Sequence, residues 1–302
     1  MVAFAQQAKQ NNDEVFIFVA NMHALTELHD PIAIRQNTIN VVKTYIASGL
    51  SPDTVKIYTG AHIAAHAQLA WVLNCVTHVG FMKRMHAFKA KADLWLEDEL
   101  SVGTFTYPIL MAADILLYDA DFVPVGKDQK QHVEYARDIA QKFNHIFGEI
   151  FKLPEPYIKE EVATVPGIDG RKMSKSYNNY IGMLDNAETI KKKVMQIPTD
   201  ALPVEAPKNP DACNVYNIYK LFLSPAEDTV LRERYTAWGL SYKQVKTELV
   251  DVISAFVTPF QERYHNVDDA MVIELLRAHS VEVAKIASAK IDAVYAAVGF
   301  TL

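Results

Sequence analysis

The segment Asp169-Gly-Arg-Lys-Met-Ser-Lys-Ser-Tyr177 concentrates more potential chemistry than any other stretch of the chain. It carries three cationic side chains and two serine hydroxyls, those of Arg171, Lys172, Lys175, Ser174 and Ser176. Such groups can neutralise a polyphosphate and the charge that develops on a departing pyrophosphate. A solvated basic turn has a similar composition, so this segment alone leaves both interpretations open.

A second polar motif, Gly126-Lys-Asp-Gln129, follows the short apolar run at 122–125 and precedes a long helical pattern. Gly126 allows a ligand to approach the backbone closely, and the start of a helix offers N–H groups without intrahelical partners. Asp128 can accept hydrogen bonds from both hydroxyls of a ribose. It could equally cap the helix without any ligand.

The apolar helical segment 107–118 carries one acid, Asp114. At 100° per residue, Tyr107, Met111 and Asp114 fall on nearly one face, and Pro108 is expected in the first helical turn, with Tyr107 at the entrance. A carboxylate in such surroundings needs a donor. A ligand group that only donates, such as an indole N–H, would satisfy it, and so would a nearby Arg or Lys.

Histidines and cysteines give weaker signals. His23 follows the first strand-like run, where it is either a structural residue or a pocket residue. His62 and His66 are four residues apart, but no third ligand pattern accompanies them, so we interpret them as structural. Cys75 and Cys213 fit neither a disulfide framework nor a metal site. No metal site is expected in the protein itself.

Taken together, the motifs resemble those of the tryptophanyl-tRNA synthetases, which are class I aminoacyl-tRNA synthetases. The resemblance rests on Lys172-Met-Ser-Lys-Ser176 and on Val123-Pro-Val-Gly-Lys-Asp-Gln-Lys-Gln-His132, and it extends along nearly the whole chain. It implies ATP-dependent activation of tryptophan and transfer to tRNA(Trp), with Mg²⁺ accompanying ATP, in a homodimer. A tyrosyl enzyme is the nearest enzymatic alternative, but a phenol both donates and accepts, and the Met111/Asp114 pair suits an indole better.

The resemblance also assigns residues. ATP would be bound by Gly126, Lys127, Asp128, Val165, Lys172, Met173, Ser174, Lys175 and Ser176, with Lys172 and Lys175 as the catalytic cations. Tryptophan would be bound by His23, Tyr107, Met111, Asp114, Val123, Val125 and Gln129, with Asp114 reading the indole nitrogen.

The order of elements predicts an α/β fold with a doubly wound parallel sheet. Strand-like runs at 15–20, 55–59 and 122–125 alternate with helical patterns at 31–48, 64–77, 108–118 and 128–147. Strand signals disappear after residue 187, a Pro-rich connection spans 198–210, and helical periodicity covers 214–300. We therefore predict a Rossmann-like catalytic domain at 1–186 and a smaller all-helical, anticodon-binding domain at 187–302.

Composition sets further limits. The 302 residues are 50% hydrophobic with a net charge of −6, and the chain contains neither a long uncharged apolar run nor a secretory leader pattern. A cytosolic location without a membrane is therefore expected. The net charge neither supports nor excludes tRNA binding. Basic runs at 83–91 and 191–193 are either RNA contacts or solvated helix faces.

The second class I signature, His-Ile-Gly-His or a variant, is not found in this sequence. Met1-Val-Ala-Phe-Ala-Gln-Gln7 resembles the helix that follows that signature, so about twenty residues, including a central strand, are expected to be missing. Either Met1 is an internal methionine of a longer gene product, which we favour because the downstream site residues are in place, or the chain is a truncated paralogue that binds tryptophan, nucleotide or tRNA without catalysis.

Overall fold

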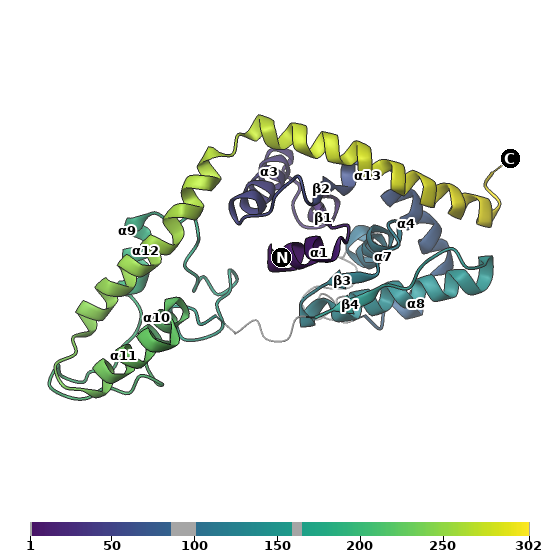
Figure 1. Cartoon of the computed structure of the whole chain (residues 1–302). Coiled ribbons are helices and arrows are strands. Elements are labelled where there is room, and N and C mark those ends of the chain that lie inside the picture. The colour runs from purple at the N-terminus through teal and green to yellow at the C-terminus, as the bar shows by residue number, and fades with distance from the viewer. Residues whose placement is uncertain (1, 86–100, 159–164, 302) are drawn as a thin grey trace. The chain divides into compact units, whose positions relative to one another are not determined.

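The computed structural model describes residues 2–85, 101–158 and 165–301 (Figure 1). They form two compact units, the first made of Met1–Glu160 with Val267–Leu302 and the second of Glu161–Asn266. This division differs from the predicted domains, because the segment 169–177, called the signature loop below, belongs to the second unit and the C-terminal helix to the first. The assignment of catalysis to 1–186 and of anticodon binding to 187–302 stays a prediction.

The N-terminal part of the first unit is a β-α-β arrangement. Strands β1 (Phe16–Val19) and β2 (Lys56–Thr59) pair in parallel, with Phe16 opposite Lys56. Helix α3 (Pro31–Ala47) connects them, and its first turn is fixed by Asp30, whose carboxylate accepts from the N–H groups of Ile32 and Ala33. Shorter elements complete this part: α1 (Val2–Asn11), α2 (Asn21–Ala24) and η1 (Gly60–His62).

A second pair of parallel strands follows later in the same unit. Strand β3 (Phe122–Pro124) pairs with β4 (Glu155–Tyr157). The other elements in the described residues of this part are α4 (Ala65–Val76), α5 (Val79–Met82), α7 (Val102–Leu116), η3 (Lys127–Gln129) and α8 (Lys130–Phe147). The parallel pairing and the intervening helices agree with the predicted α/β class. Strand β4 was not predicted, because three residues with a central proline give no periodic signal.

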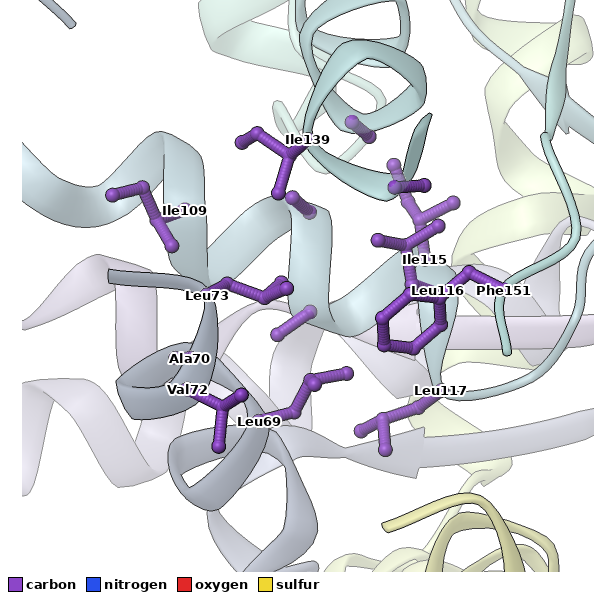
Figure 2. Close-up of a cluster of buried hydrophobic side chains, with 14 of the residues drawn as sticks. Leu69, Ala70, Val72, Leu73, Ile109, Ile115, Leu116, Leu117, Ile139 and Phe151 are labelled. Carbon is purple, nitrogen blue, oxygen red and sulfur yellow. The ribbon is translucent and has the colours of Figure 1, made fainter. Parts of the chain in front are cut away.

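The core of the first unit lies where α4, α7 and α8 pack together. Figure 2 shows Leu69 and Leu73 of α4 facing Ile109 and Leu116 of α7, with Ile139 of α8 against them. Leu69 and Leu73 are fully buried. Burial of each such side chain contributes about 1.5–3 kcal/mol. The buried face of helix α7 is therefore anchored in the core.

The prediction that Pro108 lies in the first helical turn was wrong. Helix α7 starts six residues earlier, and the hydroxyl of Ser101 accepts from the N–H of Thr104 as its N-cap. Pro108 therefore lies inside the helix, where it leaves the carbonyl of Thr104 without its usual N–H partner. Tyr107 consequently projects from the second turn rather than from the helix entrance.

Helix α13 (Asp269–Val298) packs against β2, α3 and α4 of the first unit. Its side chains Val283, Ala287, Ile291 and Val294 join the core around α4 and α7. Nδ1 of His279 accepts the backbone N–H of Ile57 in β2 over 2.9 Å. The C-terminal helix is thus tied to a strand more than 200 positions away in the sequence.

The His279 contact predicts a pH dependence of stability. Burial, and then the nearby charge of Lys56, lower the pKa of His279 from 6.5. The unprotonated Nδ1 is also the form that can accept the N–H of Ile57. The unfolded chain therefore binds more protons than the folded chain below about pH 6.5, and stability is lost as the pH falls through the lowered pKa. We expect the free energy of unfolding, measured with urea, to decrease from pH 7 to pH 5.

A pair of variants isolates this contribution. His279→Leu should reduce the slope of the free energy of unfolding against pH, by at most the amount that corresponds to one bound proton. His29→Gln, at an exposed histidine of the same unit, should leave this slope unchanged. An identical slope in His279→Leu and the unmodified protein would contradict the assignment.

The second unit is helical around its own core. Its helices are α9 (Ala187–Met195), α10 (Asn214–Tyr219), η4 (Lys220–Phe222), α11 (Pro225–Thr236) and α12 (Tyr242–Asn266). Tyr216 and Tyr235 are fully buried at its centre, and α9 packs against α12. Among the helices in the described ranges of both units, none is long and apolar enough to cross a membrane.

Candidate active site

Asp114 is the centre of a hydrogen-bonded cluster in the first unit. Its Oδ2 accepts from Nε2 of His23 over 2.7 Å, and its Oδ1 accepts from Nδ1 of His66 over 2.5 Å. The Asp114 side chain is only 7% exposed. Two donors offset the cost of burying the carboxylate, so its partners are histidines rather than the Arg or Lys considered from the sequence.

The cluster continues beyond His66. Nε2 of His66 lies 2.8 Å from the hydroxyl of Tyr118, whose ring meets that of Tyr58 edge-on with centroids 5.4 Å apart. Burial raises the pKa of Tyr58 and of Tyr118 well above 10, so both phenols keep their protons at neutral pH. His66, which the sequence analysis interprets as structural, is therefore in direct contact with Asp114.

His23 brings a second predicted pocket residue to the acid. The ring of Tyr107 meets the His23 ring edge-on with centroids 6.2 Å apart, and the Tyr107 hydroxyl lies 3.4 Å from Nε2 of His132. Side chains of α2 and α7 thus converge around Asp114. The predicted apolar wall residues Met111, Val123 and Val125 are half-buried and pack against the same core.

The turn between β3 and α8 has the predicted local form. Gly126 has an extended conformation (φ −70°, ψ 163°) before η3, and its carbonyl accepts from the N–H of Gln129 over 3.0 Å. Lys127 is exposed and Gln129 is half-buried. Asp128 lies within η3, and its role at a ribose stays a prediction.

The signature loop is a hairpin in the second unit. Pro166 and Lys172 form an antiparallel bridge, and the N–H of Met173 donates to the carbonyl of Val165 over 2.8 Å. Val165, Lys172, Lys175 and Ser176 are exposed, whereas Met173 and Ser174 are half-buried. Lys172 and Lys175 are therefore displayed on the surface of the second unit.

Arg171 has other partners. It pairs with Asp169 over 2.7 Å and lies over the ring of Tyr177, 4.6 Å from its centroid. A hydrogen bond from Asn179, and then those from Arg171, lower the pKa of Asp169, which keeps this carboxylate ionised. Arg171 is thus engaged within the loop, and Lys172 and Lys175 are better placed to meet an incoming phosphate.

Asn179 holds the hairpin closed from inside. Its side chain is 2% exposed, accepts from the N–H of Ser174 over 2.8 Å, and donates to Asp169 over 2.7 Å and to the carbonyl of Lys172 over 3.1 Å. A Cβ on Gly167 would lie only 2.3 Å from Nδ2 of Asn179, so glycine at 167 serves close packing. Gly170, with φ of 82°, provides the left-handed turn.

We expect Asn179→Ala to loosen the signature loop. Loss of the amide leaves the N–H of Ser174 without its acceptor, so hydrogen exchange at Ser174 should accelerate about tenfold. The exposed neighbour provides the control: Asn178→Gly suits the φ of 50° at that position and should leave exchange at Ser174 unchanged. If hydrogen exchange at Ser174 accelerates equally in both variants, Asn179 does not hold the loop through its hydrogen bond to Ser174.

The comparison with protein families identifies the chain's relatives. Residues 1–258 match the family described as tRNA synthetases class I (W and Y), that is, the enzymes for tryptophan and tyrosine. This chain belongs to that family. The buried acid of the first unit and the lysine loop of the second are therefore parts of a class I synthetase, and the predicted parallel α/β class with a helical C-terminal region is confirmed.

Individual relatives agree with this assignment. The tryptophan–tRNA ligase of Fusobacterium nucleatum is 42% identical over 289 residues, which cover 93% of this chain and 88% of the relative. The crystal structure of Campylobacter jejuni tryptophanyl-tRNA synthetase complexed with ADP and tryptophan has a TM-score of 0.90 and 38% identity, covering 99% of this chain and 94% of that one. The Mycoplasma pneumoniae tryptophanyl-tRNA synthetase has a TM-score of 0.75 at 28% identity, covering 96% and 89%.

Three polar residues of this synthetase were missed as functional candidates: His66, Tyr118 and Asn179. Tyr118 lies four residues after Asp114, a spacing that in a helix places two side chains on one face. That signal was present in the sequence. The contacts of His66 and Asn179 join segments whose proximity no local pattern reveals.

Proposed function

We propose that this chain is a tryptophan–tRNA ligase, which activates L-tryptophan with ATP and transfers it to tRNA(Trp). The observation that carries the choice of tryptophan over tyrosine is the buried Asp114, an acceptor whose two hydrogen-bond partners are both donors. Each carboxylate oxygen has two lone pairs, and the histidines use one on each oxygen. An indole N–H, which donates and cannot accept, satisfies such an acceptor.

In the first step, an oxygen of the tryptophan carboxylate attacks the α-phosphorus of ATP, and pyrophosphate leaves as the adenylate forms. Lys172 and Lys175 stabilise the negative charge on the departing group, and Mg²⁺ arrives with the ATP phosphates. A ribose hydroxyl of tRNA then attacks the carbonyl carbon and releases AMP. Catalysis comes from positioning and charge stabilisation, without a protein nucleophile.

The proposed ligand contacts are those that the family resemblance assigns. Gly126, Lys127, Asp128, Val165 and the segment 172–176 bind ATP. His23, Tyr107, Met111, Asp114, Val123, Val125 and Gln129 bind tryptophan. The amide of Gln129 receives the amino group, and the apolar residues line the indole ring.

Further parts of the proposal concern partners and location. We expect a homodimer in the cytosol that binds tRNA, with the helical region approaching the anticodon. Lys191 and Lys192 on α9 are exposed cations of that region. Of the other basic run, residues 86–91 lie outside the described part of the chain. The competing function is a non-catalytic paralogue that binds tryptophan, nucleotide or tRNA.

Tryptophan-dependent exchange between ATP and pyrophosphate decides between the two functions. The full-length product of the gene should incorporate labelled pyrophosphate into ATP when tryptophan is present, and much less when tyrosine replaces it. Binding of tryptophan without exchange would support the non-catalytic alternative, and preferential exchange with tyrosine would refute the choice of amino acid.

A further inference from the structure

The two oxygens of Asp114 lie in different surroundings. Oδ1 accepts from His66, whose side chain is 0% exposed, whereas Oδ2 accepts from His23, whose side chain is 18% exposed. A ligand can therefore approach Asp114 from the His23 side, while the His66 side is closed by the protein. Both histidines thus donate to Asp114, one from the buried side and the other from the partly exposed side.

The proton on His66 can be placed from its partners. A carboxylate can only accept, so Nδ1 of His66 donates to Asp114. In the neutral ring, Nε2 then accepts from the hydroxyl of Tyr118. The donors therefore follow one order, from Tyr118 through His66 to Asp114.

Packing fixes the orientation of the His66 ring. Phe18 of β1 stacks on it with centroids 5.4 Å apart and planes inclined by 22°. The rings of Tyr58 and Tyr118 lie at 6.1 Å and 5.7 Å. Because a fully buried ring between aromatic neighbours cannot turn without opening the core, its N–H direction is fixed before any ligand binds.

We propose that His66, oriented by Tyr118, is a positioning residue for tryptophan recognition. By donating to Oδ1, it holds the Asp114 carboxylate in one orientation, so that a lone pair of Oδ2 meets the indole N–H. His66 does not touch the ligand and acts only through Asp114. This inference rests on the proposed function, and it adds a specificity role for a buried histidine and a tyrosine.

The test compares tryptophan with its benzothiophene analogue, in which sulfur replaces the indole N–H. If the inference holds, His66→Leu raises the KM for tryptophan about tenfold, leaves the KM for the analogue within about twofold, and does not change the KM for ATP. His66→Asn should restore most of the loss, because its amide N–H can replace Nδ1–H as donor. His62→Leu, at an exposed histidine four residues earlier in η1, should have no effect.

Equal loss for tryptophan and the analogue would overturn the inference, because it would mean that His66 only shapes the pocket. If His66→Leu does not fold, Tyr118→Phe decides: it removes one hydroxyl, and a loss confined to tryptophan supports the role while an equal loss for both refutes it. An unmodified protein that does not distinguish tryptophan from the analogue would instead refute the assignment of Asp114 in the proposed function.

Discussion

Replacing Asp114 by asparagine is expected to raise the KM for tryptophan in ATP–pyrophosphate exchange by about 10- to 100-fold, because a hydrogen bond to a charged acceptor is lost. The amide retains the size of the side chain but keeps only one acceptor oxygen, and its NH₂ group faces a histidine donor. The KM for ATP should change by no more than about twofold, since the predicted ATP contacts are made by other residues.

The control for this substitution is Asp138→Asn, which removes an exposed carboxylate of α8 in the same unit and should leave both KM values unchanged. Thermal unfolding of Asp114→Asn should be recorded as well, because His23 and His66 lose part of their acceptor. If the KM values for tryptophan and ATP rise by the same factor in a folded variant, Asp114 does not read the indole.

Lys172→Ala and Lys175→Ala are each expected to lower kcat of ATP–pyrophosphate exchange by about 10²- to 10³-fold. This is the effect typical of removing one group that stabilises charge in the transition state. The equilibrium dissociation constant for tryptophan, measured by dialysis with labelled amino acid, should stay unchanged. Such a division between kcat and amino-acid affinity separates charge stabilisation from binding of the ground state.

Two further variants sharpen this test. Lys191→Ala removes an exposed cation of α9 and should leave kcat of ATP–pyrophosphate exchange, which does not involve tRNA, unchanged. Arg171→Ala should have a smaller effect than either lysine variant, because Arg171 already pairs with Asp169 and stacks on Tyr177. If kcat falls by a similar factor in the Lys172, Lys175 and Lys191 variants, the two lysines of the signature loop act only through the general positive charge of the surface.

Local patterns in the sequence predicted the elements that depend on local physics. The alternation of apolar runs placed β1, α3 and β2 within one or two residues, because strand and helix periodicities differ and Asp30 caps its helix. The start of α7 was predicted wrongly because proline is typical of the first turn of a helix. In this protein the N-cap at Ser101 and the packing of the helix outweigh that preference.

Part of the candidate site could also be predicted from local sequence. Asp114 was identifiable because a charged residue is rarely found in an apolar helix, and the signature loop was identifiable because its composition is unusual. The partners His66 and Asn179 were not, since their significance arises only when segments distant in the chain meet. A buried polar residue is recognisable from sequence, whereas the group that satisfies it depends on tertiary structure.

The return of α13 to the first unit bears on biosynthesis. Translation proceeds from the N-terminus, so the ribosome completes residues 161–266 before it adds the helix that contributes Val283, Ala287 and Ile291 to the core around α4. Until then, apolar side chains of α4 lack part of their cover, and the N–H of Ile57 lacks the imidazole that accepts from it. Nascent chains that stop before residue 279 should therefore be the species most dependent on chaperones.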